Sequence, residues 1–248
     1  MDTGGAYSGF AAVYDELMQP PYDDWAVYAE ALWLRFGAGK PSLVLDLACG
    51  TGNITTRLAK MGYDVIGVDC AEEMLSVAAT KNQDILYLCQ DMREFELYGT
   101  VDAACCLCDG MNYLADENEL AQVLSLVRNY LNPGGVFVFD LNTEHYFANV
   151  LSGNVFAEAS ETAAYIWEND YDPETKTNEY AVTFFVQEAN GLYRRFEELH
   201  NETAFSDEEV RRAAASAGLT VCAAFDGAGF DERNDTTERV YYVMQKNS

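Results

Sequence analysis

Hydrophobic residues follow two different periods along the chain, and the change of period divides it into regions. At the start they are spaced as on one face of a helix, both before and after the pair Pro20–Pro21. This spacing predicts two amphipathic helices. Their apolar faces are formed by Phe10, Val13, Tyr14 and Leu17 in the first helix, and by Trp25, Tyr28, Ala29, Leu32 and Trp33 in the second.

From Ser42 onward, short apolar runs alternate with stretches of helical pattern. Such alternation is typical of βαβ units, in which parallel strands are joined by right-handed crossovers. We therefore predict a doubly wound parallel sheet. The expected strands are 42–48, 63–69, 84–89, 101–108 and 136–141, and the expected helices lie near 52–61, 71–80 and 117–130.

Beyond residue 150 the pattern changes to strands joined by turns. Turn residues at Asp172–Pro173 and Asn190–Gly191 separate three strand-like segments, 162–170, 177–188 and 192–205. This arrangement predicts an antiparallel insertion.

The last part of the chain returns to the core pattern. Ser206 and Glu209 have the spacing of a capping box, and Gly218 is placed to end the helix that they begin. Two further strands are expected at 219–225 and 239–245. The predicted fold class is α/β, a doubly wound and mostly parallel sheet of seven strands in residues 1–150 and 206–248, with an antiparallel lid-like insertion in residues 151–205.

The charge of the chain bears on its partners. It carries 15 Lys and Arg against 41 Asp and Glu, a net charge of −26. Nucleic acids and anionic membranes are disfavoured, because binding them requires a basic surface. The sequence has no basic stripe, only the short pairs Arg194–Arg195 and Arg211–Arg212. No apolar run is long enough to span a membrane and the N-terminus lacks the pattern of a signal peptide, so we expect a cytoplasmic protein. The sequence does not indicate the oligomeric state.

Seven cysteines lie mostly in apolar, strand-like runs, and their number is odd. We expect buried free thiols in a reducing compartment. The two histidines, His145 and His200, are distant in sequence from the cysteines, so no metal site is expected. The cysteines are Cys49, Cys70, Cys89, Cys105, Cys106, Cys108 and Cys222.

A glycine-containing turn follows the first predicted strand, in the segment DLACGTGN (46–53). Gly50 and Gly52 allow the backbone to approach a ligand at the carboxyl end of this strand, where open parallel sheets bind ligands. The spacing differs from G-x-G-x-x-G, which argues against a dinucleotide pyrophosphate and favours a ligand that carries an amine and a carboxylate. Asp69 ends the next strand, where a carboxylate accepts ribose hydroxyls. Asp91 follows the third strand, where a carboxylate can read an adenine edge.

These motifs occur in the order of the class I S-adenosylmethionine-dependent methyltransferases, which residues 40–145 resemble. LDLACGTG (45–52) resembles the first motif of that family, although Ala48 replaces its commonest first glycine. The later motifs are GVDCAEEML (67–75), CQDMRE (89–94), CCLCDGMNYL (105–114) and LNPGGVFVFDLNT (131–143). The segments FAAVYDELMQPPYDDW and RFEELHNETAF are further similar to a branch of small bacterial methyltransferases akin to glycine and sarcosine N-methyltransferases.

The resemblance implies S-adenosylmethionine as cofactor, S-adenosylhomocysteine as product, and a role for particular residues. At the methionine part, Ala48 and Gly50 would line the site, Asp46 and the Cys108 carbonyl would lie near the amino group, and Tyr14 and Trp25 would cover the carboxylate. Asp69 would hold the ribose. At the adenine, Cys70 and Met74 would flank the ring, and Asp91 and the Met92 amide would read its edge. For Met74, Tyr14 and Trp25, packing in the core is the alternative.

The implied chemistry is an in-line methyl transfer, for which an enzyme supplies proximity, alignment and a dry pocket. An acceptor that loses a proton also needs a base. The negative charge of the chain favours a cationic cofactor and a neutral or cationic acceptor, so we expect a small-molecule N or O acceptor. The candidate catalytic groups are Asp109, Tyr113 and His200, together with Tyr7 and Glu198; Glu198 and His200 share one strand face, which points either to the pocket or to solvent.

Three alternatives remain open at this point. The first is a methyltransferase that acts on RNA or protein. The second is a nicotinamide-dependent oxidoreductase, which would share the fold. The third is a module that binds S-adenosylmethionine without catalysis.

Overall fold

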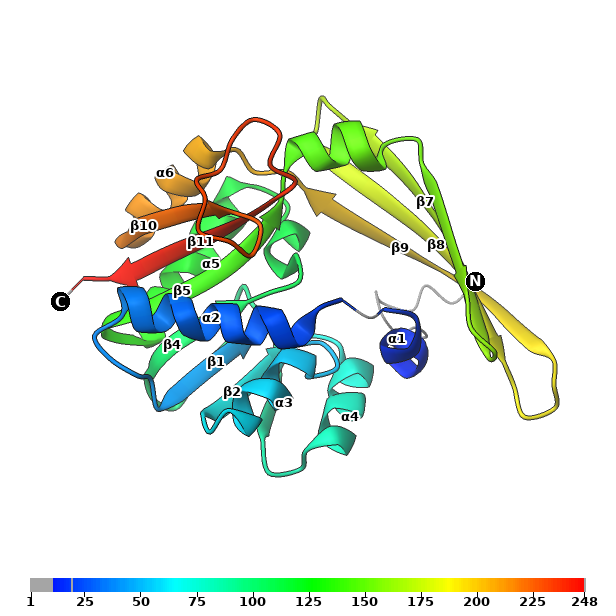
Figure 1. The fold of residues 1–248 in the computed structure, drawn as a ribbon, viewed down its shortest axis with the longest axis horizontal. Helices are drawn as coiled ribbons and strands as arrows, with labels where there is room; N and C mark the ends of the chain where they lie inside the picture. The colour runs from blue at the N-terminus through cyan, green and yellow to red at the C-terminus, as the bar shows by residue number, and fades with distance from the viewer. Residues whose placement is uncertain (1–10, 19, 248) are drawn as a thin grey trace.

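The computed structural model describes residues 11–18 and 20–247. Seven strands form one sheet in the order β10-β11-β5-β4-β1-β2-β3 (Figure 1). Strands β1 to β5 are parallel, and β11 runs antiparallel to both of its neighbours, so the predicted seven-stranded, mostly parallel sheet is confirmed. The strands are β1 (Leu43–Leu47), β2 (Asp64–Asp69), β3 (Leu86–Cys89), β4 (Val101–Cys106), β5 (Leu131–Asn142), β10 (Leu219–Asp226) and β11 (Arg239–Lys246).

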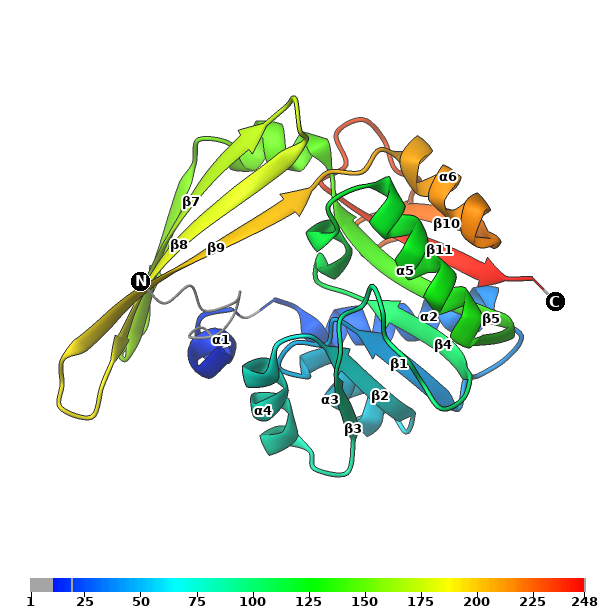
Figure 2. The same ribbon diagram turned by 180° about the vertical axis from the view of Figure 1, so that it is seen from behind.

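Helices cover both faces of this sheet (Figure 2). One face packs against α2 (Tyr22–Phe36) and α3 (Asn53–Lys60), and the other packs against α5 (Glu117–Tyr130) and α6 (Asp207–Ala217). Helix α4 (Glu72–Lys81) packs against β2 and β3. Successive side chains of each strand point to opposite faces, so Val44 enters one hydrophobic core and Leu45 the other.

The α6 helix begins as the sequence predicts. The Ser206 hydroxyl accepts a hydrogen bond from the Glu209 amide, and the Glu209 carboxylate accepts one from the Ser206 amide. Gly218, in the left-handed conformation with φ 75°, ends the helix.

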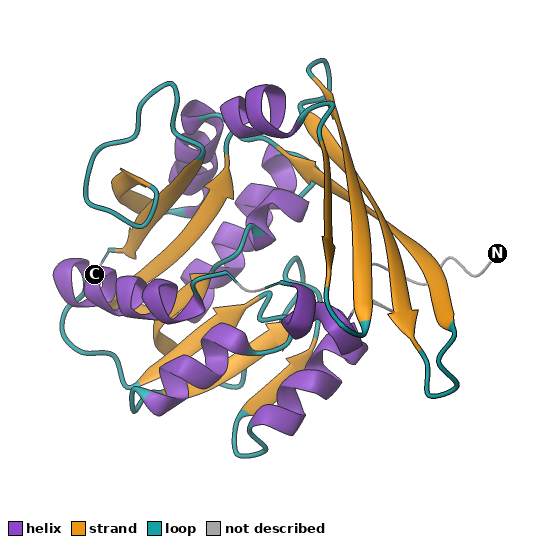
Figure 3. Ribbon diagram, turned by 45° about the vertical axis from the view of Figure 1, so that its right-hand side comes forward, coloured by secondary structure: helices purple, strands orange, loops and turns teal. Residues whose placement is uncertain are grey.

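A second, antiparallel sheet stands at one end of the core, inserted between β5 and α6 (Figures 1 and 3). It packs on α1 (Ala11–Leu17) and on the short helix η2 (Tyr146–Leu151) through a hydrophobic cluster that includes Val13, Phe147 and Phe184. Its strands in spatial order are β6 (Val155–Ala159), β7 (Ala163–Asp172), β8 (Thr177–Gln187) and β9 (Tyr193–Thr203).

The structure differs from the sequence predictions in several elements. Strand β6 was not expected, because all five of its residues are exposed at the sheet edge and leave no alternation of buried positions. The short helices η1 (Gly110–Tyr113) and η2 were also not expected. Strand β5 begins at Leu131 rather than at 136, because Leu131 pairs with Val101 before the register shifts. Phe10 and Tyr7 lie outside the described residues.

The prediction of buried thiols is wrong for Cys70 and Cys89. Both are exposed, because they lie at the ends of β2 and β3 near the open edge of the sheet. Cys49, Cys105 and Cys106 are buried as expected. Among the described helices, none combines the length and the apolar composition needed to cross a bilayer.

Candidate active site

Hydrogen bonds hold the turn after β1 against the end of β2. The Asp69 carboxylate accepts hydrogen bonds from the Gly50 amide at 2.8 Å and from the Ala71 amide at 2.9 Å. Gly50 has φ 52°, and apart from Gly50 and its two chain neighbours no residue has an atom within 4 Å of the point that a Cβ would occupy. The conformation and the free space together explain a glycine here.

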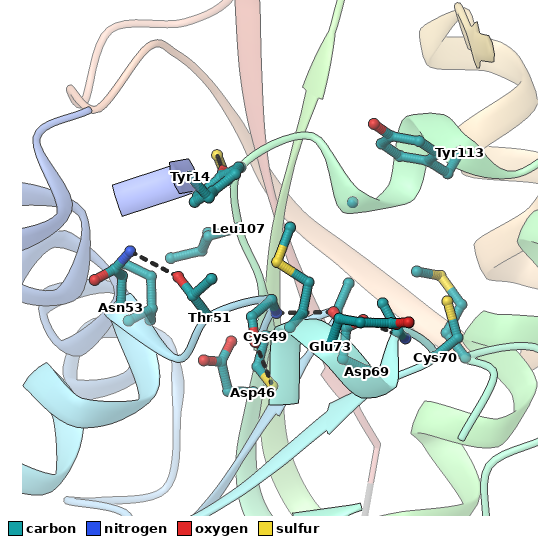
Figure 4. A pocket seen from close by; sticks show the side chains of 18 of the residues that line it. Tyr14, Asp46, Cys49, Thr51, Asn53, Asp69, Cys70, Glu73, Leu107 and Tyr113 are labelled. Carbon is teal, nitrogen blue, oxygen red and sulfur yellow. Dashed lines mark hydrogen bonds between the residues drawn. The ribbon is translucent and has the colours of Figure 1, made fainter. Parts of the chain in front are cut away.

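This turn forms one wall of a first cavity of about 510 Å³, a size that suits a small-molecule ligand. The other walls are the start of α4, the loop after β4 and the helix α1. Figure 4 shows Tyr14 and Tyr113 across the cavity from Asp46 and Asp69. The sequence-predicted cofactor residues that line this cavity are Tyr14, Asp46, Ala48, Gly50, Asp69, Cys70, Met74, Met92 and Cys108.

Two buried carboxylates dominate the electrostatics of the first cavity. Asp46 accepts hydrogen bonds from the Thr55 hydroxyl at 2.5 Å and from the Cys105 thiol at 3.5 Å, yet burial raises its pKa to about 6. Burial also raises the pKa of Asp69, against the opposing effect of its backbone hydrogen bonds. The cavity therefore presents oxygen acceptors and negative charge to a ligand.

Helix α1 is held over the first cavity by its own carboxylate, Asp15. The side chains of Thr51 and Asn53 each donate a hydrogen bond to Asp15 at 2.7 Å, and Lys81 forms an ion pair with it at 2.5 Å. These contacts join α1 to the glycine turn and to α4. They place the neighbouring Tyr14 in the cavity wall.

A second cavity of about 350 Å³ adjoins the first, and Tyr14, Cys108 and Tyr113 line both. It lies between the core and the inner face of the second sheet, and many of the residues that line it are aromatic. The aromatic residues that line it are Tyr14, Trp25, Tyr113, Tyr146, Tyr165, Trp167, Tyr180 and Phe184.

Charged groups are paired within the second cavity. Arg239 at the start of β11 bonds to Asp109 at 2.6 Å and to the buried Asp140, and its guanidinium lies 5.5 Å from the centre of the Trp25 ring. Glu202 accepts hydrogen bonds from the Tyr180 hydroxyl at 2.9 Å and from the Asn142 amide at 3.3 Å.

The ionisation of Glu202 is opposed by its surroundings. Burial and the nearby Asp109 raise the pKa of Glu202 well above its usual range. A cation entering the second cavity would relieve this effect.

Tyr113 joins the core to the second sheet. The Tyr113 hydroxyl lies 3.2 Å from Nδ1 of His200, and Nε2 of His200 lies 3.3 Å from the Glu198 carboxylate. His200 and Glu198 are both buried, which answers the question that their position on one strand face left open: that face points inward. Of the two, His200 lines the second cavity.

The backbone around both cavities is strained. Among the described residues, the left-handed region is occupied by four that are not glycine, and Ala48, Cys108 and Asp109 are three of them. All three line a cavity. Backbone strain of this kind concentrates at functional sites, where the surrounding structure enforces it.

Two predicted cofactor residues lie elsewhere. Trp25 lines the second cavity rather than the first, and Asp91 lines neither. The Asp91 carboxylate instead bonds to the Arg93 guanidinium, which holds the pKa of Asp91 below its usual range. The predicted catalytic residues Asp109, Tyr113 and His200 all line the second cavity.

Sequence reasoning missed Arg239, Glu202 and Asp15. Arg239 is a cation at the start of the otherwise largely apolar strand RVYYVMQ, and this contrast is the one sign of its role that the sequence offers. The other two occur in acidic surroundings within a strongly acidic chain and have no distinguishing pattern.

The fold and the two cavities define a class of protein. A doubly wound sheet that places a glycine turn and the carboxylate of Asp69 at adjacent strand ends, with a second cavity alongside, describes an enzyme that binds a nucleoside-containing cofactor and a separate substrate.

Comparison with known proteins identifies the family. The model of the methyltransferase domain family matches residues 44–135. YqeM of Bacillus subtilis (strain 168), named provisionally as a methyltransferase, is 36% identical over 245 residues, 97% of each chain. The crystal structure of an S-adenosylmethionine-dependent methyltransferase from Clostridium acetobutylicum ATCC 824 has a TM-score of 0.85 and 29% identity, and the match covers 98% of this chain and 99% of that one. The chain belongs to the S-adenosylmethionine-dependent methyltransferases.

Two further relatives are named as N-methyltransferases. The dTDP-3-amino-3,6-dideoxy-alpha-D-glucopyranose N,N-dimethyltransferase of Streptomyces fradiae is 28% identical over 220 residues, 87% of this chain and 86% of its own. A glycine/sarcosine N-methyltransferase of Halorhodospira halochloris matches over 103 residues, 39% of this chain and 38% of its own. The family membership decides against a nicotinamide-dependent oxidoreductase and against a module without catalysis.

The residues of the first cavity fit S-adenosylmethionine. Its cationic sulfonium and amine suit a cavity lined by Asp46 and Asp69, and its ribose needs the acceptors that Asp69 provides. The open space beside Gly50 accommodates a ligand that a larger side chain would exclude. A pyrophosphate would meet these carboxylates unfavourably.

Proposed function

We propose that this enzyme methylates the nitrogen of a small-molecule amine that binds in the second cavity. The observation that carries the proposal is that the two cavities meet at Tyr14, Cys108 and Tyr113. A cofactor in the first cavity and an acceptor in the second would face each other at this junction, which is the requirement for an in-line transfer.

The first cavity would hold the cofactor through its carboxylates and its glycine turn. Asp69 would accept hydrogen bonds from the ribose hydroxyls, Asp46 would lie near the amino group, and Gly50 would admit the methionine part. S-adenosylmethionine supplies an activated methyl group on a sulfonium and leaves as S-adenosylhomocysteine. Helix α1, anchored through Asp15, would exclude water from this cavity.

The second cavity favours an amine for two reasons. Its acidic lining residues Asp109, Glu158 and Glu202 provide no partner for an anionic acceptor, and its one lysine or arginine among the described lining residues, Arg239, is already paired with Asp109 and Asp140. Its aromatic walls favour a cation above their faces and an apolar body between them. The Streptomyces fradiae N,N-dimethyltransferase among the relatives is named for methylation of an amino group, carried in that case by a dTDP-linked sugar.

Neither RNA nor protein is proposed as substrate. The net charge of −26 opposes association with a polyanion. The second cavity, where the acceptor is proposed to bind, lies between the core and the second sheet and is of a size for a small molecule rather than a folded chain. The acceptor atom is proposed to be nitrogen rather than oxygen, because carboxylates favour the cationic form of an amine and have no comparable effect on an alcohol.

The first experiment is calorimetric titration of the protein with S-adenosylmethionine and S-adenosylhomocysteine, beside the Asp69→Ala variant. Micromolar binding that is lost in the variant is the expected result. The second experiment incubates the protein and S-adenosylmethionine with amines and matching alcohols, such as 2-phenylethylamine and 2-phenylethanol, and measures S-adenosylhomocysteine by mass spectrometry. Turnover of amines supports the proposal, whereas turnover of alcohols or RNA with no amine methylated would overturn it.

A further inference from the structure

Polar contacts link Tyr113, His200 and Glu198 into a chain that joins the core to the second sheet. Tyr113 belongs to the core and lines both cavities, while His200 and Glu198 belong to β9 of the second sheet. The two rings meet edge to face, with centroids 6.0 Å apart. The second sheet therefore contributes a titratable group at the point where the two cavities join.

The contacts of His200 define which nitrogen carries a proton. Nε2 lies 3.3 Å from the Glu198 carboxylate, and an ionised carboxylate can only accept hydrogen bonds, so Nε2 carries hydrogen and donates it. Nδ1 is then the acceptor and faces the Tyr113 hydroxyl at 3.2 Å. This is the arrangement in which a carboxylate orients an imidazole and fixes its tautomer.

We infer that Tyr113 and His200 form a proton-transfer chain that deprotonates the acceptor amine, with Glu198 as the residue that positions His200. This inference rests on the proposed function. The ammonium form of the amine gives one proton to the Tyr113 oxygen as the Tyr113 hydroxyl proton passes to Nδ1 of His200. The free nitrogen lone pair then forms the N–C bond, the C–S bond breaks, and its electron pair stays on sulfur. His200 releases its proton to solvent.

The other charged groups around the second cavity are less suited to this role. Asp109 is paired with Arg239, and Glu202 is bonded to Tyr180 and Asn142. The titratable and charged groups that face the cavity with His200 are Tyr14 on α1, Cys108 and Asp109 after β4, Tyr113 on η1, Tyr146 on η2, Glu158 on β6, Tyr165 on β7, Tyr180 on β8, Glu202 on β9 and Arg239 on β11.

The tautomer of His200 provides a test that needs no substrate. The chain has two histidines, so ¹⁵N imidazole spectra contain two spin systems, and His145→Gln assigns them. The neutral ring of His200 is expected to carry hydrogen on Nε2, to lose this preference in Glu198→Ala, and to retain it in Glu198→Gln. Glu197→Ala, an exposed neighbour on the same strand, is the control and leaves the spectrum unchanged. A neutral ring that carries hydrogen on Nδ1 in the wild-type protein would overturn the inference.

Kinetics test the catalytic role. With 2-phenylethylamine, His200→Gln and Tyr113→Phe are expected to lower kcat about 100-fold at pH 7, the lower range for general acid–base catalysis, and by less at high pH where the amine loses its proton unaided. Glu198→Gln should recover part of the kcat that Glu198→Ala loses. His200→Gln does not alter the first cavity, so its affinity for S-adenosylhomocysteine stays within about threefold of wild type, a factor worth well under 1.4 kcal/mol.

The outcomes separate the inference from the proposed function. If His200→Gln retains both the wild-type kcat and the wild-type pH profile while it binds S-adenosylhomocysteine, the proton-transfer chain is refuted and the methyltransferase proposal stands. If the wild-type protein methylates alcohols or RNA but no amine, the proposed acceptor fails, while the tautomer measurement still decides the arrangement of His200.

Discussion

The backbone amide of Gly50 donates a hydrogen bond to the carboxylate of Asp69, and this bond joins the turn after β1 to the end of β2. The second carboxylate oxygen of Asp69 accepts a hydrogen bond from the Ala71 amide, at the start of α4. One side chain thus fixes two walls of the first cavity and presents its remaining lone pairs to a ligand. Shape and recognition in this cavity depend on the same residue.

Asp69→Asn is therefore expected to weaken cofactor binding strongly. The asparagine side chain can accept only one of the two amides and turns a donor toward the other. A hydrogen bond to a charged group contributes about 1.5–3 kcal/mol, which corresponds to a loss of roughly 10- to 150-fold in affinity. Calorimetric titration with S-adenosylhomocysteine measures this loss.

Asp91→Asn is the matched comparison for Asp69→Asn, because it makes the same chemical change at the end of the next strand. Asp91 lies outside the lining of the first cavity and is bonded to Arg93, so we expect a smaller loss of affinity. An equal loss in the two variants would show that Asp91 leaves Arg93 and turns to the cofactor, as the family resemblance implies.

A substitution of Gly50 is expected to lower cofactor affinity by more than its effect on folding stability explains. Gly50→Ala places a Cβ in open space beside the first cavity and forces a left-handed conformation on alanine, a strain of about 1–2 kcal/mol. Gly62→Ala is the control, because Gly62 also has positive φ with no atom near its Cβ position and does not line the cavity. Both variants should lose similar amounts of unfolding free energy in urea, and only Gly50→Ala should lose cofactor affinity.

Local sequence pattern was sufficient to predict the strands and the turn that surround the first cavity. The strands, the glycine turn and the carboxylate that follows β2 are encoded by short segments, through alternation of apolar residues or a motif within a few residues. Nine of the cofactor residues that the family resemblance implies also line the first cavity.

The second cavity was not predictable in the same way, because its contacts join distant parts of the chain. Arg239 and Asp109 are 130 residues apart, and Tyr113 and His200 are 87 apart. The sequence indicated that His200 and Glu198 share a face but not which way it points. That direction is decided by how the second sheet packs on α1 and η2.

The ion pairs of Arg239 are expected to be important for stability. Arg239→Met would leave the buried Asp140 without its cation, and an uncompensated buried charge costs about 3–5 kcal/mol. The double variant Arg239→Met with Asp140→Asn removes both members and should recover part of the loss. Urea unfolding at pH 7 measures both variants, and additive losses in the double variant would show that the two side chains do not depend on each other.

The buried Asp46 is expected to make stability depend on pH with a definite sign. Its pKa in the folded protein is about 6, above the ordinary value of 3.8, so folding favours its protonated form. The contribution of Asp46 to the free energy of unfolding is fully present below pH 4 and is lost as the pH rises to about 6, a total loss of about 3 kcal/mol. The unfolding free energy of the wild-type protein relative to Asp46→Asn should therefore fall between pH 4.5 and 6 and stay constant up to pH 8. Asp64→Asn, at the exposed start of β2, controls for the change in net charge, and a wild-type-minus-Asp46→Asn difference that does not vary with pH would contradict the prediction.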